Sequence, residues 1–218
     1  MKPSTSKPSY AHIRCLLIDL DDTLYPKETG AWDRVGERID HFLVHEMGFS
    51  HDEVQPLRAR LFSQYGTTLR GLQIEYEVDM DAYLDFVHDI PIEELLTPDP
   101  ELDQVLQALP QRKVIFTNAS ARHAIRVGQQ LGVRNHFERI IDIYDQYPFC
   151  KPELDAFHKA LTLVDEQPQH CLMVDDNPKN LESARSLGME TVIVGAHRHD
   201  GSPHIPDIKA LAQLIAHS

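Results

Sequence analysis

The chain has 218 residues, of which 42% are hydrophobic and 25% are charged, as in globular proteins with a buried core. Its formal net charge of −13 argues against the broad basic surface that nucleic acids or anionic lipids require. We therefore expect neither a nucleic-acid polymer nor a membrane as partner. Small anionic substrates stay compatible, because a metal ion and a few cations can invert the local field.

The N-terminal stretch and the cysteines predict the compartment. Residues 1–11 lack the apolar segment of a signal peptide, so we expect a loosely attached tail there. No apolar run reaches the about 20 residues that a membrane span needs. The three cysteines, Cys15, Cys150 and Cys171, form no CxxC pair, and Cys15 and Cys171 begin apolar runs as small buried residues do. A reducing, cytoplasmic location fits this pattern.

Five short apolar runs predict strands. They show little alternation between apolar and polar residues, which is typical of strands that are covered on both faces, as in a parallel sheet. In chain order the runs are residues 15–20, 113–118, 139–144 (the weakest), 171–176 and 191–195.

Helical segments with recognisable ends separate the later runs. Ser120 is expected to cap a helix that ends at Gly132, and Asn177 with the following proline to begin one that ends at Gly188. Pro152 is expected just inside the start of another helix. Strands that alternate with helices predict an α/β fold with a doubly wound, mainly parallel sheet.

The interval 28–97 interrupts this alternation. It has no strand-like run, and its apolar residues, from Trp32 to Leu43 and beyond, recur at helical spacing. Ser50 and Glu53 have the spacing of a capping box. We expect a small all-helical unit over 28–97, inserted after the first strand of an α/β core made of residues 12–27 and 98–218.

Polar residues follow the predicted strands where each one ends, and the carboxyl ends of parallel strands meet at one edge of a sheet. Lys151 precedes a proline, which disfavours helical geometry and places it in a loop. Four distant segments therefore deliver one group of side chains to that edge: Asp19, Asp21, Thr117, Asn118, Lys151, Asp175 and Asp176.

This group of residue types suits phosphoryl chemistry. Clustered carboxylates repel one another, so a hard cation, most simply Mg²⁺, is expected among them. A carboxylate beside Mg²⁺ can attack phosphorus, and a second acid two residues on can protonate the leaving oxygen. Thr117 can hydrogen-bond the transferring phosphoryl group, while Lys151 and the metal offset its charge.

Four motifs resemble those of the haloacid dehalogenase-like phosphohydrolases. "DLDDT" (19–23) matches the DxDxT signature, "FTN" (116–118) resembles the second motif, "CKPE" (150–153) the third, and "VDDNPKN" (174–180) the fourth. The resemblance covers nearly the whole chain. The helical insertion matches the position of the small cap domain in that superfamily.

The resemblance implies roles for the acids. Asp19 would be the nucleophile that forms an aspartyl-phosphate, and Asp21 the general acid and base. Mg²⁺ would be held by Asp19, by the backbone carbonyl of Asp21 and chiefly by Asp176, with Asp175 as a second ligand or as a partner of the ligands. Family members that cleave carbon–halogen bonds lack the acid at position 21, so its presence favours a phosphatase.

Three longer stretches resemble pyrimidine 5′-nucleotidases: "DLDDTLYP", "YGTTLRGL" and "FTNASARHAIRVGQQLGV". This likeness implies a nucleoside monophosphate as the small phosphorylated substrate. Tyr25, Arg70 and His123, together with Asn118, would then contact it. Tyr65 suits packing better, because it ends an amphipathic helix.

The sequence leaves alternative functions open and predicts supporting roles for several residues near the motifs. A phosphatase or phosphomutase for a sugar phosphate would use the same residues, and a receiver-like signalling domain or a binding protein without turnover would keep the fold. Asp22 is expected to face away without a catalytic role, Thr23 to brace the loop, and Asn180 to support the metal acids. The histidine-rich stretch 197–204 is expected to be a polar loop rather than a metal site.

Overall fold

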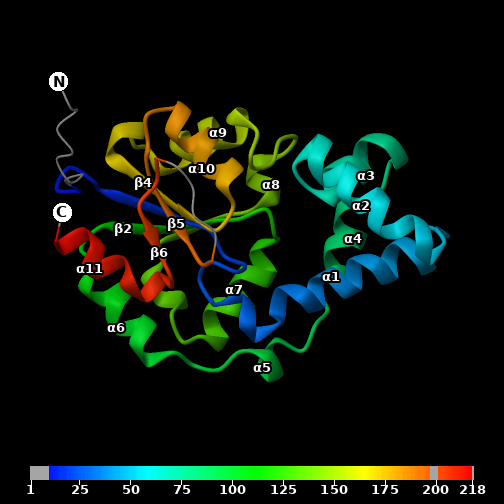
Figure 1. Ribbon diagram of the computed structural model, residues 1–218, viewed down its shortest axis with the longest axis horizontal. Coiled ribbons are helices and arrows are strands. Elements are labelled where there is room, and N and C mark those ends of the chain that lie inside the picture. Colours follow the sequence, from blue (N-terminus) through cyan, green and yellow to red (C-terminus); the bar gives the residue numbers. More distant parts are fainter. Residues whose placement is uncertain (1–9, 197–200, 218) are drawn as a thin grey trace.

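The computed structural model describes residues 10–196 and 201–217, and its centre is a six-stranded sheet (Figure 1). The strand order is β3-β2-β1-β4-β5-β6, and every neighbouring pair is parallel. This confirms the predicted doubly wound α/β class. The strands are β1 (Cys15–Ile18), β2 (Arg112–Phe116), β3 (Arg139–Ile141), β4 (Cys171–Asp175), β5 (Glu190–Val194) and β6 (His204–Ile205).

Burial on both faces explains why the strands read as unbroken apolar runs. In β1, Leu16 and Ile18 belong to one hydrophobic cluster, whereas Cys15 and Leu17 belong to another on the opposite face. All four side chains are fully buried. The sequence did not predict β6, because two residues make no apolar run and only pairing with β5 defines the strand.

Helices cover both faces of the sheet (Figure 1). Apolar residues of α6 (Pro100–Ala108), α7 (Ala121–Gln130) and α11 (Leu211–Ala216) join one cluster. Those of α9 (Leu154–Val164) and α10 (Pro178–Ser186) join the other. The remaining short helices of this part are α8 (Ile143–Gln146) and the 3₁₀ turns Arg134–His136, Pro168–His170 and Ile208–Ala210.

Two predicted helix starts are confirmed and one is wrong. The Ser120 hydroxyl accepts the N–H of His123 at the start of α7, and the Asn177 side chain accepts the N–H of Lys179 at the start of α10. Pro152, however, lies before α9, which begins at Leu154. A turn precedes that helix, in which the N–H of Glu153 donates to the Cys150 carbonyl at 2.8 Å and the Glu153 carboxylate accepts the N–H of Cys150.

Four helices stand beside the sheet at one end of the molecule (Figure 1). The carboxylate of Glu53 accepts hydrogen bonds from the N–H and the hydroxyl of Ser50, so the predicted capping residues do begin a helix. We call this group of helices the helical segment: α1 (Ala31–His41), α2 (His51–Tyr65), α3 (Thr68–Tyr76) and α4 (Met80–Val87). A 3₁₀ turn (Lys27–Thr29) precedes α1 and a π-helical turn (Phe42–Glu46) follows it.

The chain returns to the sheet directly after α4. Arg126 of α7 donates hydrogen bonds to the backbone carbonyls of His88 and Ile90, and α5 (Ile92–Leu95) lies beside α7. The domain limits expected from the sequence (12–27 with 98–218, and 28–97) stay a prediction.

Several sequence features fall at the margins of the described residues. Tyr10, in the predicted tail, is buried against the core, and residues 1–9 lie outside the described part. Residues 197–200 of the histidine-rich stretch also lie outside it. Cys15, Cys150 and Cys171 are all buried, as predicted for the first and third. Among the described residues, no helix is long and apolar enough to cross a bilayer.

Candidate active site

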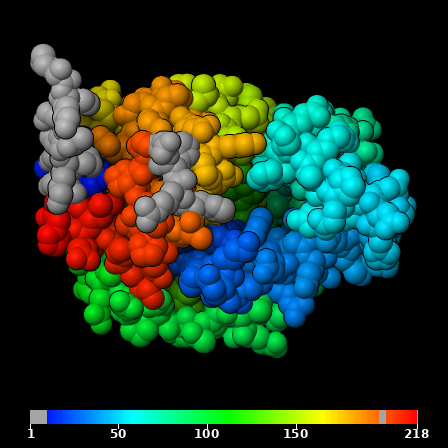
Figure 2. Space-filling model, in the orientation of Figure 1, coloured from blue at the N-terminus to red at the C-terminus, as the bar shows by residue number. Residues whose placement is uncertain are grey.

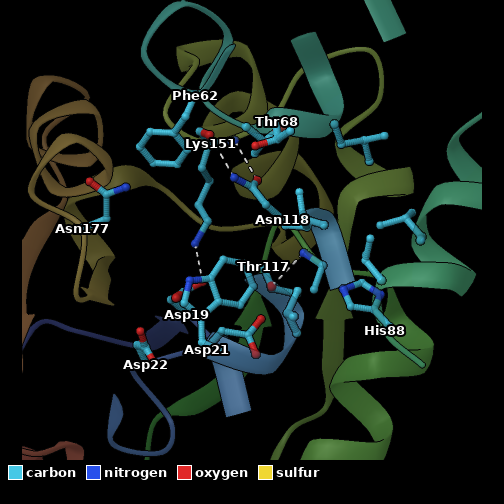
Figure 3. Close-up of a pocket in the computed structure, with 18 of the residues that line it drawn as sticks. Asp19, Asp21, Asp22, Phe62, Thr68, His88, Thr117, Asn118, Lys151 and Asn177 are labelled. Atoms are coloured by element: carbon cyan, nitrogen blue, oxygen red, sulfur yellow. Dashed lines mark hydrogen bonds and ion pairs between the residues drawn. The ribbon is translucent and has the colours of Figure 1, made fainter. Parts of the chain in front are cut away.

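Strand pairing brings the first acids together. Ile18 at the end of β1 lies beside Val174 of β4, and the N–H of Asp19 donates to the Val174 carbonyl at 2.9 Å. The side chains of Asp19 and Asp175 therefore leave neighbouring strands at the same level of the sheet. Figure 3 shows Asp19 beneath the extended Lys151, with Thr117 and Asn118 around the same hollow.

Lys151 bridges these two carboxylates. Its Nζ donates to Asp19 Oδ1 at 2.7 Å and to Asp175 Oδ2 at 2.9 Å, and the residue is only 2% exposed. Burial by itself would lower the pKa of Lys151, but the charges of Asp175 and Asp19 outweigh it and raise that pKa. The lysine is therefore a buried ammonium ion held between two carboxylates.

Asn118 and Gln146 hold the backbone around Lys151. The Asn118 amide accepts the N–H of Lys151 and donates to its carbonyl, both at 2.9 Å. Gln146 donates to the carbonyl of Thr117 at 2.6 Å and accepts the Lys151 N–H at 3.3 Å. Asn118, expected to contact substrate, thus also positions Lys151. Gln146, the last residue of α8, escaped the sequence analysis because it belongs to none of the four motifs and to no periodic apolar pattern.

The two acids at the end of β4 have different surroundings. Both oxygens of Asp175 are occupied, by Lys151, by Asn180 Nδ2 and by the N–H of Asn177. Asp176 has one contact through Oδ1, with the Thr23 hydroxyl at 3.4 Å, and no described residue donates to its Oδ2. Asp176 is therefore the acid with the more available oxygen.

These acids form a group that suits a divalent cation. One carboxylate oxygen from each of Asp19, Asp175 and Asp176 lies within 4.8 Å of the others. Burial raises the pKa of Asp19 and, with the charge of Asp175, raises the pKa of Asp176 to about 6. Crowded oxygen ligands of this kind match the preference of Mg²⁺.

The carboxylate of Asp21 has other partners. Its Oδ1 accepts from the Tyr25 hydroxyl and from His123 Nε2, the latter at 3.0 Å. Burial by itself would raise the pKa of Asp21, but His123 and the hydrogen bonds from His123 and Tyr25 lower it. Tyr25 and His123 are each 1% exposed and do not line the cavity above the acids, so neither side chain is open to a substrate there.

A cavity of about 300 Å³ opens between the acids and the helical segment. Figure 2 shows a hollow between the helical segment and the rest of the molecule. Its sheet side is polar and includes Asp19, Asp21, Thr117, Asn118, Lys151 and Asp176. Its other side is mainly apolar and aromatic and includes Trp32, Val35, Ile39, Phe62, Leu69, Leu84 and Val87.

Two aromatic rings and one arginine distinguish the helical side. Trp32, which the sequence placed on the apolar face of a helix, is 39% exposed at this cavity, and Phe62 is 47% exposed. Arg70 lines a second cavity of about 240 Å³ instead, with Lys179, and Phe62 borders both. No residue in the described part of the chain forms a hydrogen bond or an ion pair with the Arg70 side chain. Asp22 lines the first cavity, where burial and the charges of Asp176 and Asp21 raise its pKa to about 7.

Fold and site together define an α/β protein with a carboxylate–lysine centre at the carboxyl edge of a parallel sheet. The family model for haloacid dehalogenase-like hydrolases matches residues 13–188, and the chain belongs to this family.

Named relatives and a solved structure agree with this assignment. The chain is 30% identical over 195 residues to phosphate metabolism protein 8 of Saccharomyces cerevisiae, covering 83% of this chain and 61% of that protein. It thus spans less than two thirds of the yeast protein. It is 23% identical over 184 residues to pyrophosphatase PpaX of Bacillus mycoides, covering 84% and 83% of the two chains. The structure of a phosphatase of this family from Thermococcus onnurineus matches with a TM-score of 0.63 and 19% identity, over 93% of this chain and 98% of that one, and shows the fold.

Proposed function

We propose that this protein is a Mg²⁺-dependent phosphomonoester hydrolase that works through an aspartyl-phosphate on Asp19. Its membership of the haloacid dehalogenase-like hydrolases and its likeness to pyrophosphatase PpaX support a phosphatase of that family. The observation that carries the proposal is the buried bridge from Lys151 to Asp19 and Asp175, with Asp21 lining the same cavity.

The proposed chemistry uses the free oxygen of Asp19. Lys151 occupies Oδ1, and no described residue donates to Oδ2, so Oδ2 is available to attack phosphorus. The bond from phosphorus to the leaving oxygen breaks, and that oxygen takes a proton from Asp21. Water then gives a proton to Asp21 and attacks phosphorus, which releases phosphate and restores Asp19.

Thr117 supports the same reaction. Its Oγ1 accepts the N–H of Ala119 at 3.0 Å, so the hydroxyl hydrogen remains free to donate to a phosphoryl oxygen. Lys151 lies close enough to Asp19 for its charge to offset the charge of the phosphoryl group.

For the metal we propose Asp19, Asp176 and the backbone carbonyl of Asp21 as ligands. Asp175 would act mainly as their organiser, because both of its oxygens already accept hydrogen bonds. Bound Mg²⁺ would supply positive charge to the transferring phosphoryl group.

A pyrimidine nucleoside monophosphate is the proposed substrate. The rings of Trp32 and Phe62 offer apolar faces on which a planar base can stack. The guanidinium of Arg70 lies in the adjoining cavity, where its donors could reach the carbonyl oxygens of a base. A cytoplasmic site of action stays a prediction.

A phosphate-release screen tests the proposal. Nucleoside monophosphates, sugar phosphates and pyrophosphate would each be incubated with Mg²⁺ or with EDTA. We expect release of phosphate with Mg²⁺ only, and fastest from pyrimidine nucleoside monophosphates. Faster release from a sugar phosphate or from pyrophosphate would overturn the substrate assignment but keep the hydrolase. Transfer to a sugar without release of phosphate would instead identify a phosphomutase.

A further inference from the structure

The carboxylate of Asp21 is held through only one of its oxygens. Both donors, Tyr25 Oη and His123 Nε2, reach Oδ1, and no described residue donates to Oδ2. Asp21 also lines the cavity above Asp19. An oxygen that accepts two hydrogen bonds is a poor place for a proton, so a proton on this carboxyl group belongs on Oδ2.

His123 is itself fixed by its surroundings. Its side chain is completely buried, and its ring stacks on that of His88 with centroids 4.3 Å apart and planes 15° apart. Ser120 connects the two residues, because its Oγ lies 3.1 Å from His88 Nδ1 and accepts the backbone N–H of His123 at 3.3 Å. Burial and the neighbouring His123 lower the pKa of His88 to about 3, so the His88 ring is neutral.

Two elements thus converge on one carboxylate oxygen, and a third packs against one of the two donors. Tyr25 comes from the loop after β1, His123 from the first turn of α7, and His88 from the position directly after α4. Two of these residues have no other evident task at the site, since Tyr25 and His123 do not line the cavity above the acids.

We propose that His123 is a positioning residue for Asp21. With Tyr25 it fixes Oδ1, so that Oδ2 faces the cavity and carries the proton that the leaving oxygen takes, while His88 keeps the His123 ring in place. This role differs from the substrate contact expected from the sequence. The inference rests on the proposed function, in which Asp21 is the acid.

Two esters with similar rings separate this role from a structural one. The leaving group of benzyl phosphate is a strongly basic alkoxide that needs a proton. The leaving group of p-nitrophenyl phosphate is a stable phenolate that does not. The quantity compared is kcat/KM, which reports the steps up to cleavage of the ester.

His123→Leu removes the donor and His123→Gln keeps an N–H near the same place. We expect His123→Leu to lower kcat/KM about 30-fold for benzyl phosphate and less than about 3-fold for p-nitrophenyl phosphate, and His123→Gln to restore most of the loss. Tyr25→Phe, which removes only a hydroxyl, should also lower kcat/KM more for benzyl phosphate than for p-nitrophenyl phosphate, but by a smaller factor. It provides the test if His123→Leu does not fold.

Asp21→Asn and His136→Leu calibrate the comparison. His136 forms a similar histidine–aspartate pair outside the site, with 2.6 Å between its Nε2 and Asp103 Oδ1. Its substitution should leave kcat/KM unchanged for both esters. Selective loss in Asp21→Asn but equal losses for both esters in the His123 and Tyr25 variants would overturn the positioning role alone. Equal losses in Asp21→Asn, or no phosphate release by the unmodified protein, would overturn the proposed function as well.

Discussion

The two walls of the cavity differ in how their side chains are held. On the sheet side, Asp19, Lys151 and Asp175 are buried and joined by two ion pairs. On the helical side, Trp32 and Phe62 are the exposed rings, and Arg70 in the adjoining cavity forms no side-chain hydrogen bond or ion pair with a described residue.

This difference separates chemistry from selectivity. A buried ion-pair network has one low-energy arrangement, because any displacement leaves a charge without a partner. Exposed rings lose little when they turn, so they can adapt to different leaving groups. We therefore expect substitutions on the sheet side to abolish the reaction, and substitutions on the helical side to change which ester is used.

The largest effect is expected from Asp19→Asn. The amide cannot act as the nucleophile, so phosphate release should fall on the order of 1000-fold or more, while Lys151 keeps its contact with Asp175 and the fold survives. The measurement is phosphate release, with circular dichroism as a check on folding. Asp165→Asn, at an Asp with φ 50° on the far end of α9, is the control and should retain full activity. Equal rates in both variants would contradict a nucleophilic role for Asp19.

Lys151→Met should destabilise the protein as well as inactivate it. It leaves Asp19 and Asp175 buried without their cation, a change that costs about 3–5 kcal/mol in comparable pairs. Urea unfolding in EDTA measures the loss. Lys179→Met, at an exposed lysine, should change the free energy of unfolding by less than about 0.5 kcal/mol. Equal free energies of unfolding for the two variants would contradict a stabilising role of Lys151 between Asp19 and Asp175.

Gly66→Ala tests where the two walls touch. Gly66 has φ +84°, and an added Cβ would lie 2.9 Å from the carbonyl oxygen of Lys151. Because Asn118 holds that same carbonyl, the added methyl group should displace Lys151 and reduce kcat about 10-fold or more.

Gly48→Ala is the matched control for this contact. Gly48 has φ +78°, but nothing lies within 4 Å of an added Cβ. Both variants incur the left-handed backbone cost of about 1–2 kcal/mol, which a thermal melt would detect, and only Gly66→Ala should lose activity. A comparable loss of activity in both would assign the effect to backbone strain rather than to the contact with Lys151.

The smallest effect is expected from Phe62→Ala. Loss of one stacking face should raise KM for uridine 5′-monophosphate about 5-fold with kcat nearly unchanged, and should leave KM for glycerol phosphate as it was. Tyr76→Ala removes a ring of similar exposure that lines neither cavity, and is the control. A fall in kcat without a change in KM would mean that this wall takes part in the chemistry after all.

Much of the fold was predictable because its signals are local. Unbroken apolar runs predict strands that are buried on both faces, and Ser50, Ser120 and Asn177 predict helix starts through short-range hydrogen bonds. The error at Pro152 has the same origin: a proline fits a first helical turn, and nothing in the local pattern reveals that Glu153 closes a turn before the helix.

The sequence by itself determined which chemical groups meet at the carboxyl edge of the sheet. Asp19, Lys151 and Asp175 follow from motif order and from the geometry that all parallel sheets share. Only the tertiary structure decided how these groups are held. His123 reaches Asp21 across 102 positions, Gln146 reaches the Thr117 carbonyl across 29, and Arg70 lies in a separate cavity. Contacts of this kind depend on the packing of whole helices, and packing leaves no periodic trace in the residues that make the contact.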